Sequence, residues 1–191
     1  MARIILASKS LARQKVLRQI GLKFTVFSSK AKEIRLSKSN CSRLVISNAR
    51  LKAEDAAGRF NKGIIIAADT VVLAKGKIIG KPKNLKDAAR TLKFLCHNPH
   101  WVYTGLAVVD IAGSRVLTTY DKTKVYMCAL SDEDIEKYCR KFSPLDKAGS
   151  FDIQGPGAAF IDRIEGCFYN VVGLPLAKLI ALLKRLEVDI F

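Results

Sequence analysis

Short apolar runs alternate with amphipathic segments along this chain, so its hydrophobic pattern predicts strands interleaved with helices. The apolar runs are bounded by polar or glycine-containing turns, as is typical of buried strands. We expect strands at residues 3–7, 24–27, 64–73, 78–79, 101–111, 115–129, 151–153 and 158–164.

Five other segments carry apolar residues at helical spacing, next to residues that cap helices well. Ser8 or Ser10 is suited to start the first helix, and Gly21 is suited to end it. Pro175 suits the first position of the last helix. The basic stretch 28–39 is expected to be a loop, and the predicted helices span 10–20, 40–57, 84–95, 131–141 and 176–186.

Together these elements predict an α/β fold built on one elongated mixed β-sheet flanked by helices. The tight turns Lys75-Gly76 and Ala112-Gly113 join some neighbouring strands, and helices join others, so the sheet should contain antiparallel and parallel pairs. No repeat or linker divides the chain, and 191 residues suit a single domain over 1–191, with one lobe or two.

The composition excludes some classes of protein. With 49% hydrophobic and 26% charged residues, the chain can bury a core and is not of the disordered type. No apolar run approaches the length of a membrane span, and the apolar stretch Ile4–Ala7 is too short for a signal-peptide core. We therefore expect no membrane association and a cytoplasmic protein. The five cysteines lack a C-x-x-C spacing, which predicts reduced thiols rather than a zinc site.

The positive charge is concentrated at the N-terminal end of the chain. Of the formal net charge of +16, residues 1–62 contribute +12, because they hold 15 Lys and Arg against 3 Asp and Glu. Such a field attracts a nucleic acid, a nucleotide or an acidic membrane surface, and charge alone does not choose among them. A solvated basic face without a partner is the alternative.

A serine-rich turn between the first strand and the first helix is a candidate phosphate site. Ser8 and Ser10 offer hydroxyls and backbone N–H groups at a positive helix end, and Arg13, one turn further, could close over the same anion bidentately. Plain helix capping with a surface arginine is the alternative.

Asp69 is the strongest candidate for chemistry, because it lies inside an apolar strand together with Thr70. A carboxylate in such a place must be paired, hydrogen-bonded or metal-bound. It can serve as a magnesium ligand or a general base, or it can form a structural ion pair with a buried Lys or Arg.

Four further polar residues complete the set of candidates. Lys81 lies between Gly80 and Pro82, which fix the backbone around it, and Gln154 could hydrogen-bond the edge of a base from a glycine-rich segment. Glu33 is the only acid among the first 53 residues, and Lys52 falls on a mostly apolar helix. Ordinary turn or surface roles would explain any one of these four alone.

Taken together, these segments resemble the Maf family, also called septum formation inhibitor or Maf-like proteins. The similarity runs from Ile4 to Leu183, and several motifs in one order are far more specific than any single motif. The motifs are Ala7-Ser8-Lys9-Ser10, Ala68-Asp69-Thr70-Val71-Val72, Gly80-Lys81-Pro82, Tyr103-Thr104-Gly105, Leu145-Asp146-Lys147-Ala148-Gly149, Ile153-Gln154-Gly155, Ile164-Glu165-Gly166 and Tyr169-Asn170-Val171-Val172-Gly173-Leu174-Pro175-Leu176.

The resemblance implies a nucleoside triphosphate pyrophosphatase with an elongated mixed α/β fold, in which two lobes flank a central cleft as in inosine triphosphatases. It also implies a divalent metal cation, Mg²⁺ or Mn²⁺, and commonly a homodimer. Asp69 matches the proposed proton acceptor of the family. Glu33, Lys52 and Lys81 match polar residues of its catalytic cleft, and Glu33 would join Asp69 at the metal.

The resemblance also bears on the substrate. Thr70 and Gln154 match the branch that is similar to enzymes for dTTP and UTP. The family turn usually continues Ser-Pro-Arg-Arg, whereas this chain has Leu11 and Ala12 before Arg13. Ala12 therefore replaces an arginine that is often linked to substrate choice.

The resemblance implies attack by water at the α-phosphorus, with release of nucleoside monophosphate and pyrophosphate. Asp69 would activate the water or hold the metal, while Arg13, Lys52, Lys81 and the N–H groups near Ser8 and Ser10 would stabilise charge on the phosphates. Nucleic acid is not required. The alternative is a non-catalytic nucleic-acid-binding regulator of septum formation, which the basic N-terminal segment favours and Asp69 disfavours.

Overall fold

The computed structural model describes residues 3–34 and 40–189, and it contains an open mixed sheet of seven strands. Within the described residues the strands run in the order β2-β1-β3-β5-β6-β7, and β4 pairs with part of β3. The strands are β1 (Ile4–Leu6), β2 (Thr25–Val26), β3 (Ile64–Ala74), β4 (Lys77–Ile79), β5 (His100–Asp110), β6 (Arg115–Met127) and β7 (Ile161–Glu165). The helices are α1 (Leu11–Gln19), α2 (Cys41–Ala57), α3 (Leu85–Cys96), α4 (Asp132–Phe142), α5 (Phe168–Val172) and α6 (Leu176–Arg185), with 3₁₀-helices η1 (Ala148–Ser150) and η2 (Pro156–Phe160).

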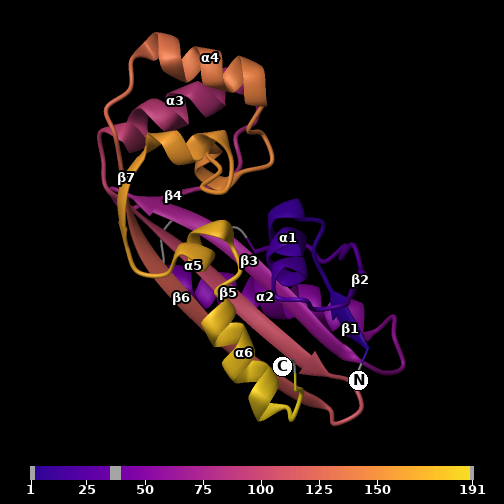
Figure 1. Cartoon of the computed structure of the whole chain (residues 1–191). Helices are drawn as coiled ribbons and strands as arrows, with labels where there is room; N and C mark the ends of the chain where they lie inside the picture. The colour runs from indigo at the N-terminus through magenta and orange to yellow at the C-terminus, as the bar shows by residue number, and fades with distance from the viewer. Residues whose placement is uncertain (1–2, 35–39, 190–191) are drawn as a thin grey trace.

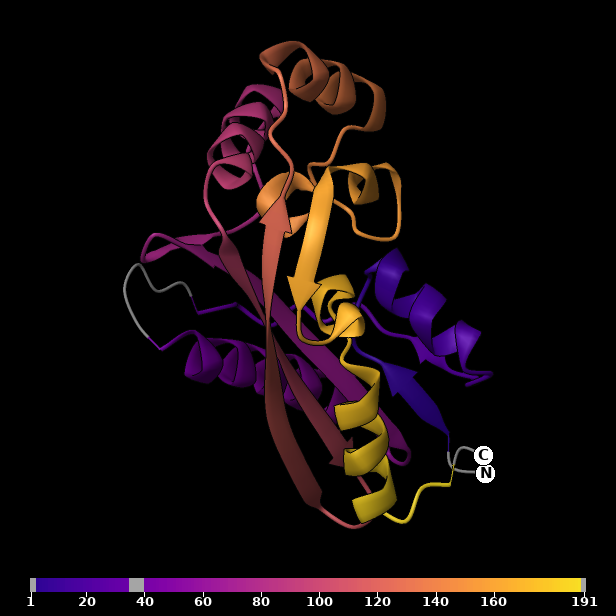
Figure 2. The same cartoon turned by 60° about the vertical axis from the view of Figure 1, so that its left-hand side comes forward.

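The lower half of the sheet is covered on both faces (Figure 1). Alternate residues of a strand point to opposite faces, so Ile65 and Ala67 of β3 pack against α2, while Ile64 and Ile66 pack into the core that contains α1 and α6. Figure 2 shows α2 on one side of the sheet and α1, α5 and α6 on the other. Because β3 is buried on both faces there, its sequence reads as one continuous apolar run.

A second lobe is built on the other end of the same long strands, where α3, α4, η1 and η2 pack together (Figure 1). Its core includes Val72 of β3 and Val102 of β5. Between the cores of the two lobes, β3 presents residues 69–71 and β5 presents residues 103–105. The polar residues within 69–71 and 103–105 therefore lie between the two lobes, outside their hydrophobic cores.

Most of the elements that the hydrophobic pattern predicts are present, with ends that differ from the prediction by at most three residues. The expected mixed sheet, the flanking helices and the two lobes are confirmed. The part of the predicted 28–39 loop that is described, residues 28–34, has no regular structure, and the rest lies outside the described residues. No described helix combines the length and apolar character that crossing a bilayer requires.

The predicted strand at 151–153 is wrong, and the predicted strand at 158–164 begins only at Ile161. Gly149 and Ser150 both have positive φ and turn the chain immediately before this stretch. Phe151 and Ile153 are buried, and neither pairs with a strand of the described part of the chain. Their alternation thus reflects burial in the second lobe and not a β-ladder. The pattern also missed α5, since five residues are too few to show a helical period.

Candidate active site

The candidate site lies at a gap along one edge of β3. On that edge, β1 pairs with β3 as far as Ile66, and β4 pairs with it only from Val72 onward. Among the strands of residues 3–34 and 40–189, none therefore lies beside residues 67–71 on that edge, while their other edge pairs with β5. The carbonyl oxygen of Ala68 instead accepts from Arg13 Nη1 at 3.0 Å and from Lys52 Nζ at 3.5 Å. Cationic side chains occupy the place that a strand would take.

Helix α2 supplies one side of the site through a polar stripe formed by Asn48, Lys52 and Asp55, which share a face at helical spacing. Asp55 accepts hydrogen bonds from Ser29 Oγ and from the backbone N–H of Lys30. These bonds lower the pKa of the Asp55 carboxyl. The backbone of residues 29–31 is thereby fixed to the C-terminal part of α2.

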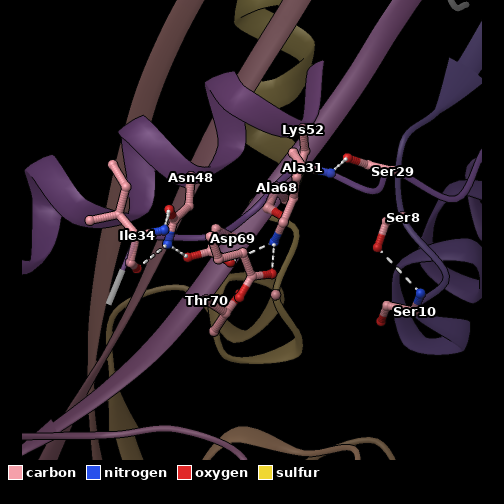
Figure 3. A network of polar contacts seen from close by, with 12 residues as sticks. Ser8, Ser10, Ser29, Ala31, Ile34, Asn48, Lys52, Ala68, Asp69 and Thr70 are labelled. Carbon is pink, nitrogen blue, oxygen red and sulfur yellow. Dashed lines mark hydrogen bonds and ion pairs between the residues drawn. The ribbon is translucent and has the colours of Figure 1, made fainter. Parts of the chain in front are cut away.

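Asn48 fixes the other end of the same loop and touches Asp69. Its amide accepts from the N–H of Ile34 at 2.8 Å and donates Nδ2 to the Ile34 carbonyl at 3.2 Å. Nδ2 also donates to Asp69 Oδ2 at 3.1 Å. Figure 3 shows Asn48 and Lys52 lying over Asp69 from α2. Since the loop is held at both ends, Glu33 is presented to the same place.

Lys52 bridges the two acidic residues of the site. Its Nζ lies 2.6 Å from Asp69 Oδ1 and 2.8 Å from Glu33 Oε1. Asp69 is 7% exposed, whereas half of the Glu33 side chain remains accessible. Burial opposes ionisation of Glu33, but the hydrogen bond and charge of Lys52, with the charges of Lys81 and Arg13, outweigh it and lower the pKa of the Glu33 carboxyl.

Arg13 is held by hydrogen bonds on the face of β3 opposite to α2. Its Nε donates to the carbonyl of Gly173 at 2.8 Å, Nη1 donates to Ser8 Oγ at 3.1 Å as well as to Ala68, and Nη2 donates to Thr70 Oγ1 at 2.9 Å. Burial lowers the pKa of the Arg13 guanidinium, while the nearby charges of Asp69 and Glu33 raise it. The predicted bidentate closure over an anion does not match this arrangement, because most of the donors are already used.

The serine turn caps α1 as the sequence predicts, and it leaves two donors over. Ser10 is the N-cap, and its hydroxyl accepts from the N–H of Arg13. Ser8 Oγ accepts from the N–H of Ser10 at 3.2 Å. Among the described residues, the N–H groups of Leu11 and Ala12 have no hydrogen-bond partner. A helix start with free N–H groups is favourable for binding an anion.

Lys81 and Gln154 lie on the other lobe. Lys81 is exposed in the connection between β4 and α3, close enough for its charge to act on Glu33. Gln154 lies in the turn between η1 and η2, where its backbone N–H donates to Asp152 Oδ1. Within the described part of the chain, no hydrogen bond joins its side chain to another predicted site residue. A surface pocket of about 340 Å³ also opens in this lobe, beside Tyr138 and Phe160, and not at Asp69.

Sequence reasoning missed Asn48, Thr104 and Gly173, which contact the predicted residues directly. A signal was present for Asn48, because it lies one helical turn before Lys52 among apolar residues of α2. Thr104 and Gly173 fall within two of the family motifs, but nothing in those motifs indicated their contacts with Thr70 and Arg13. They reach the site only because β5 and α5 fold against β3 and α1.

The donor set restricts the kind of metal that could bind. No group of three or more His, Cys, Asp and Glu side chains gathers within residues 3–34 and 40–189. Asp69 and Glu33 contact the same ammonium group, so their carboxylates lie close together. Two carboxylates fit Mg²⁺, which keeps waters and substrate phosphates among its ligands, and they do not fit a cage made by protein alone.

Comparison with known proteins identifies relatives along the whole chain. Residues 3–186 match the family model described as "Maf-like protein". A protein named dTTP/UTP pyrophosphatase from Methanosarcina barkeri is 42% identical over 192 residues, covering 100% of this chain and 98% of the relative. One of the same name from Dictyoglomus turgidum is 46% identical over 187 residues, covering 95% of each chain. The solved structure of the Staphylococcus aureus Ham1 protein superposes with a TM-score of 0.47 at 14% identity, covering 66% of this chain and 72% of that one.

Proposed function

Because this chain belongs to the family of Maf-like proteins, we propose that it hydrolyses dTTP and UTP to nucleoside monophosphate and pyrophosphate. The observation that carries the proposal is the position of Asp69, a buried carboxylate at the gap in β3 with Lys52 and Glu33 beside it. A carboxylate among cations, next to a helix start, suits water attack on a polyphosphate.

The triphosphate would lie along the gap in β3, with its charge facing Arg13, Lys52 and Lys81. The free N–H groups of Leu11 and Ala12 would bind phosphate oxygens at the positive end of α1. Ala12 supplies only its backbone N–H, where the family usually has an arginine. Lys81 approaches from the other lobe, which lets the cations spread along an extended polyphosphate.

Asp69 is the residue that we assign to the water. Its oxygens accept from Lys52 and Asn48, and each keeps a further lone pair for a water molecule. As the water oxygen bonds to the α-phosphorus, Asp69 takes its proton, and the bond from the α-phosphorus to the bridging oxygen of the leaving pyrophosphate breaks. Pyrophosphate leaves readily when its charge is neutralised, so no covalent enzyme intermediate is needed.

Asp69 and Glu33 would hold the divalent cation that the family resemblance implies. When bound, that cation supplies positive charge to the phosphates and lowers the pKa of a coordinated water. Lys52 contacts both carboxylates, so it would have to move away or share the carboxylates with the cation. We accordingly expect Mg²⁺ or Mn²⁺ to bind more tightly together with the nucleotide than alone. The family homodimer and the cytoplasmic location stay predictions, as does the assignment of residues 1–191 to one domain.

The clustering of cations supports an enzyme over a nucleic-acid-binding regulator. Lys52 contacts both acids, and its hydrogen bond and charge, together with the charges of Lys81 and Arg13, lower the pKa of Glu33. Phosphate binding along a duplex needs cations without buried acids among them.

Hydrolysis in water labelled with oxygen-18 tests the bond that is cut. We expect the label in the nucleoside monophosphate and none in pyrophosphate, with dTTP and UTP ahead of dATP and GTP in kcat/KM. Label in orthophosphate with a nucleoside diphosphate as the second product would contradict the proposed reaction. A panel led by 7-methyl-GTP or ITP would contradict the pyrimidine preference.

A further inference from the structure

Thr70 does not share a face with Asp69. Successive residues of β3 point to opposite sides of the sheet, so Asp69 faces α2, while Thr70 faces α1 and α5. The Thr70 hydroxyl lies 2.9 Å from Arg13 Nη2 and 2.9 Å from Thr104 Oγ1. It therefore contacts a guanidinium group and a second hydroxyl.

The directions of these hydrogen bonds are determined by the supply of protons. Thr104 Oγ1 donates its proton to the carbonyl of Asn170 at 2.9 Å, so it must accept from Thr70. Thr70 consequently uses its one proton on Thr104 and accepts from Arg13. The chain of donation runs from Arg13 through Thr70 and Thr104 to Asn170, and each bond in such a chain polarises the next.

Helix α5 closes this chain into a ring. The N–H of Gly173 donates to the same carbonyl of Asn170 at 3.0 Å, and the carbonyl of Gly173 accepts from Arg13 Nε at 2.8 Å. Asn170 is fully buried and is anchored by its Nδ2, which donates to Val102 and Thr123. The ring is thus attached to the middle of the sheet.

The ring leaves Arg13 almost no freedom. A guanidinium has five N–H donors, and Gly173, Ser8, Ala68 and Thr70 take four of them. Among the residues that the structure describes, one N–H on Nη2 has no partner. Arg13 is held at β3 as a fixed positive charge with a single spare donor, and it has no pair of donors with which to clamp a phosphate.

We propose that Thr70, Thr104 and Gly173 are positioning residues that act through Arg13 on the triphosphate, and that Thr70 does not read the base. This inference rests on the proposed function. A base reader at position 70 would change the ratio of kcat/KM between substrates. Loss of a positioning residue would instead weaken the binding of every triphosphate by the same factor, because all of them share the phosphates.

The test compares Thr70→Val, which keeps the shape and removes the hydroxyl, with Thr70→Ser, which restores it. We expect Thr70→Val to raise KM roughly tenfold for dTTP, UTP and GTP alike, with kcat within about twofold, and Thr70→Ser to be near wild type. A merely structural loss reduces the active fraction and lowers kcat while leaving KM unchanged. Thr118→Val, on an exposed position of β6, is the matched control.

Gly173→Ala gives an independent test at the other end of the ring. A Cβ at Gly173 would lie 3.1 Å from Thr70 Oγ1 and 3.4 Å from Arg13 Nε, at a φ of +101°. We expect the same uniform rise in KM.

An altered preference between dTTP and GTP in Thr70→Val, or an unchanged KM, would overturn the inference while the wild type still released pyrophosphate. A wild type that releases no pyrophosphate would refute the proposed function itself. In that case, calorimetry with pyrophosphate still tests the role of Thr70 in positioning Arg13. Thr70→Val should bind pyrophosphate more weakly than the wild type, and equal affinities would overturn the inference.

Discussion

Both oxygens of Asp69 are engaged, Oδ1 by Lys52 and Oδ2 by Asn48. Replacing the carboxylate by an amide keeps its shape but removes its charge and basicity. We expect Asp69→Asn to lower kcat for dTTP by about two orders of magnitude or more, as for loss of a general base or metal ligand. Asp110→Asn at the end of β5 is the control, and thermal unfolding checks that both variants fold. A folded Asp69→Asn enzyme with near wild-type turnover would disprove the assignment.

The sequence identifies this residue better than it identifies its surroundings. An acid inside an apolar strand needs a partner wherever the strand lies, so Asp69 could be selected from its neighbours alone. The partners depend on tertiary structure. Thr70 meets Arg13 from 57 positions away, and Thr104 meets Asn170 from 66 positions away. The motif match included Thr70 but did not show that its hydroxyl faces a guanidinium.

At the scale of elements, the position of α2 decides whether the site forms. A Cβ at Gly105 would collide with the backbone carbonyl of Val45, so α2 crosses β5 in direct backbone contact. We expect Gly105→Ala to lower the free energy of unfolding by about 3 kcal/mol. The same change should reduce activity, since it displaces Asn48 and Lys52. Gly58→Ala at the end of α2 meets only ordinary contacts and should have little effect. Chemical denaturation measures both, and equal stabilities would contradict this account.

Burial of His100 at the start of β5 makes the second lobe sensitive to acid. The side chain is fully buried, Nε2 has no hydrogen-bond partner within residues 3–34 and 40–189, and burial lowers the pKa of the imidazole to about 4. The unfolded chain takes up this proton near pH 6.5, whereas the folded protein does not until about pH 4. Stability from the neutral ring is complete above pH 6.5 and is lost as the pH falls to 4, by at most roughly 3 kcal/mol.

The difference between wild type and His100→Met in unfolding free energy isolates this effect. We expect the difference to change with pH between 6.5 and 4 and to be constant above pH 7. His97→Gln, at an exposed position at the end of α3, should follow the wild-type curve. Parallel curves for wild type and His100→Met across this window would rule the explanation out.

The elements themselves follow from the sequence where the hydrophobic pattern has one cause. In β3 and α2 most of the apolar positions of the sequence are buried in the structure, and the predicted bounds are nearly those observed. For residues 151–153 the same alternation arises from burial between two 3₁₀-helices, and pattern alone does not separate this from a strand. The gap in β3 was also not predictable, because it depends on where β1 ends and β4 begins.

At the scale of the whole molecule, the structure shows where the positively charged N-terminal segment lies. Residues 1–62 carry a net charge of +12, and they include α1 and α2, which flank the gap in β3 from its two faces. Within the described residues 3–34 and 40–62, the excess positive charge therefore belongs to the lobe whose helices α1 and α2 flank the gap, and not to the lobe of α3 and α4. A field of this kind raises the rate at which an anionic substrate arrives, and salt screens it.

Two double variants with the same change in net charge separate this local field from total charge. Lys9 and Lys15 are exposed beside the serine turn and on α1, whereas Lys86 and Lys141 are exposed on α3 and α4 of the other lobe. We expect Lys9→Gln with Lys15→Gln to lower kcat/KM for dTTP several-fold at low ionic strength. Lys86→Gln with Lys141→Gln should leave it nearly unchanged. The difference should vanish by about 0.5 M salt, where the screening length falls to a few ångströms. Equal losses in the two double variants would mean that only the total charge matters, and a loss that persists at high salt would mean that Lys9 or Lys15 contacts the substrate directly.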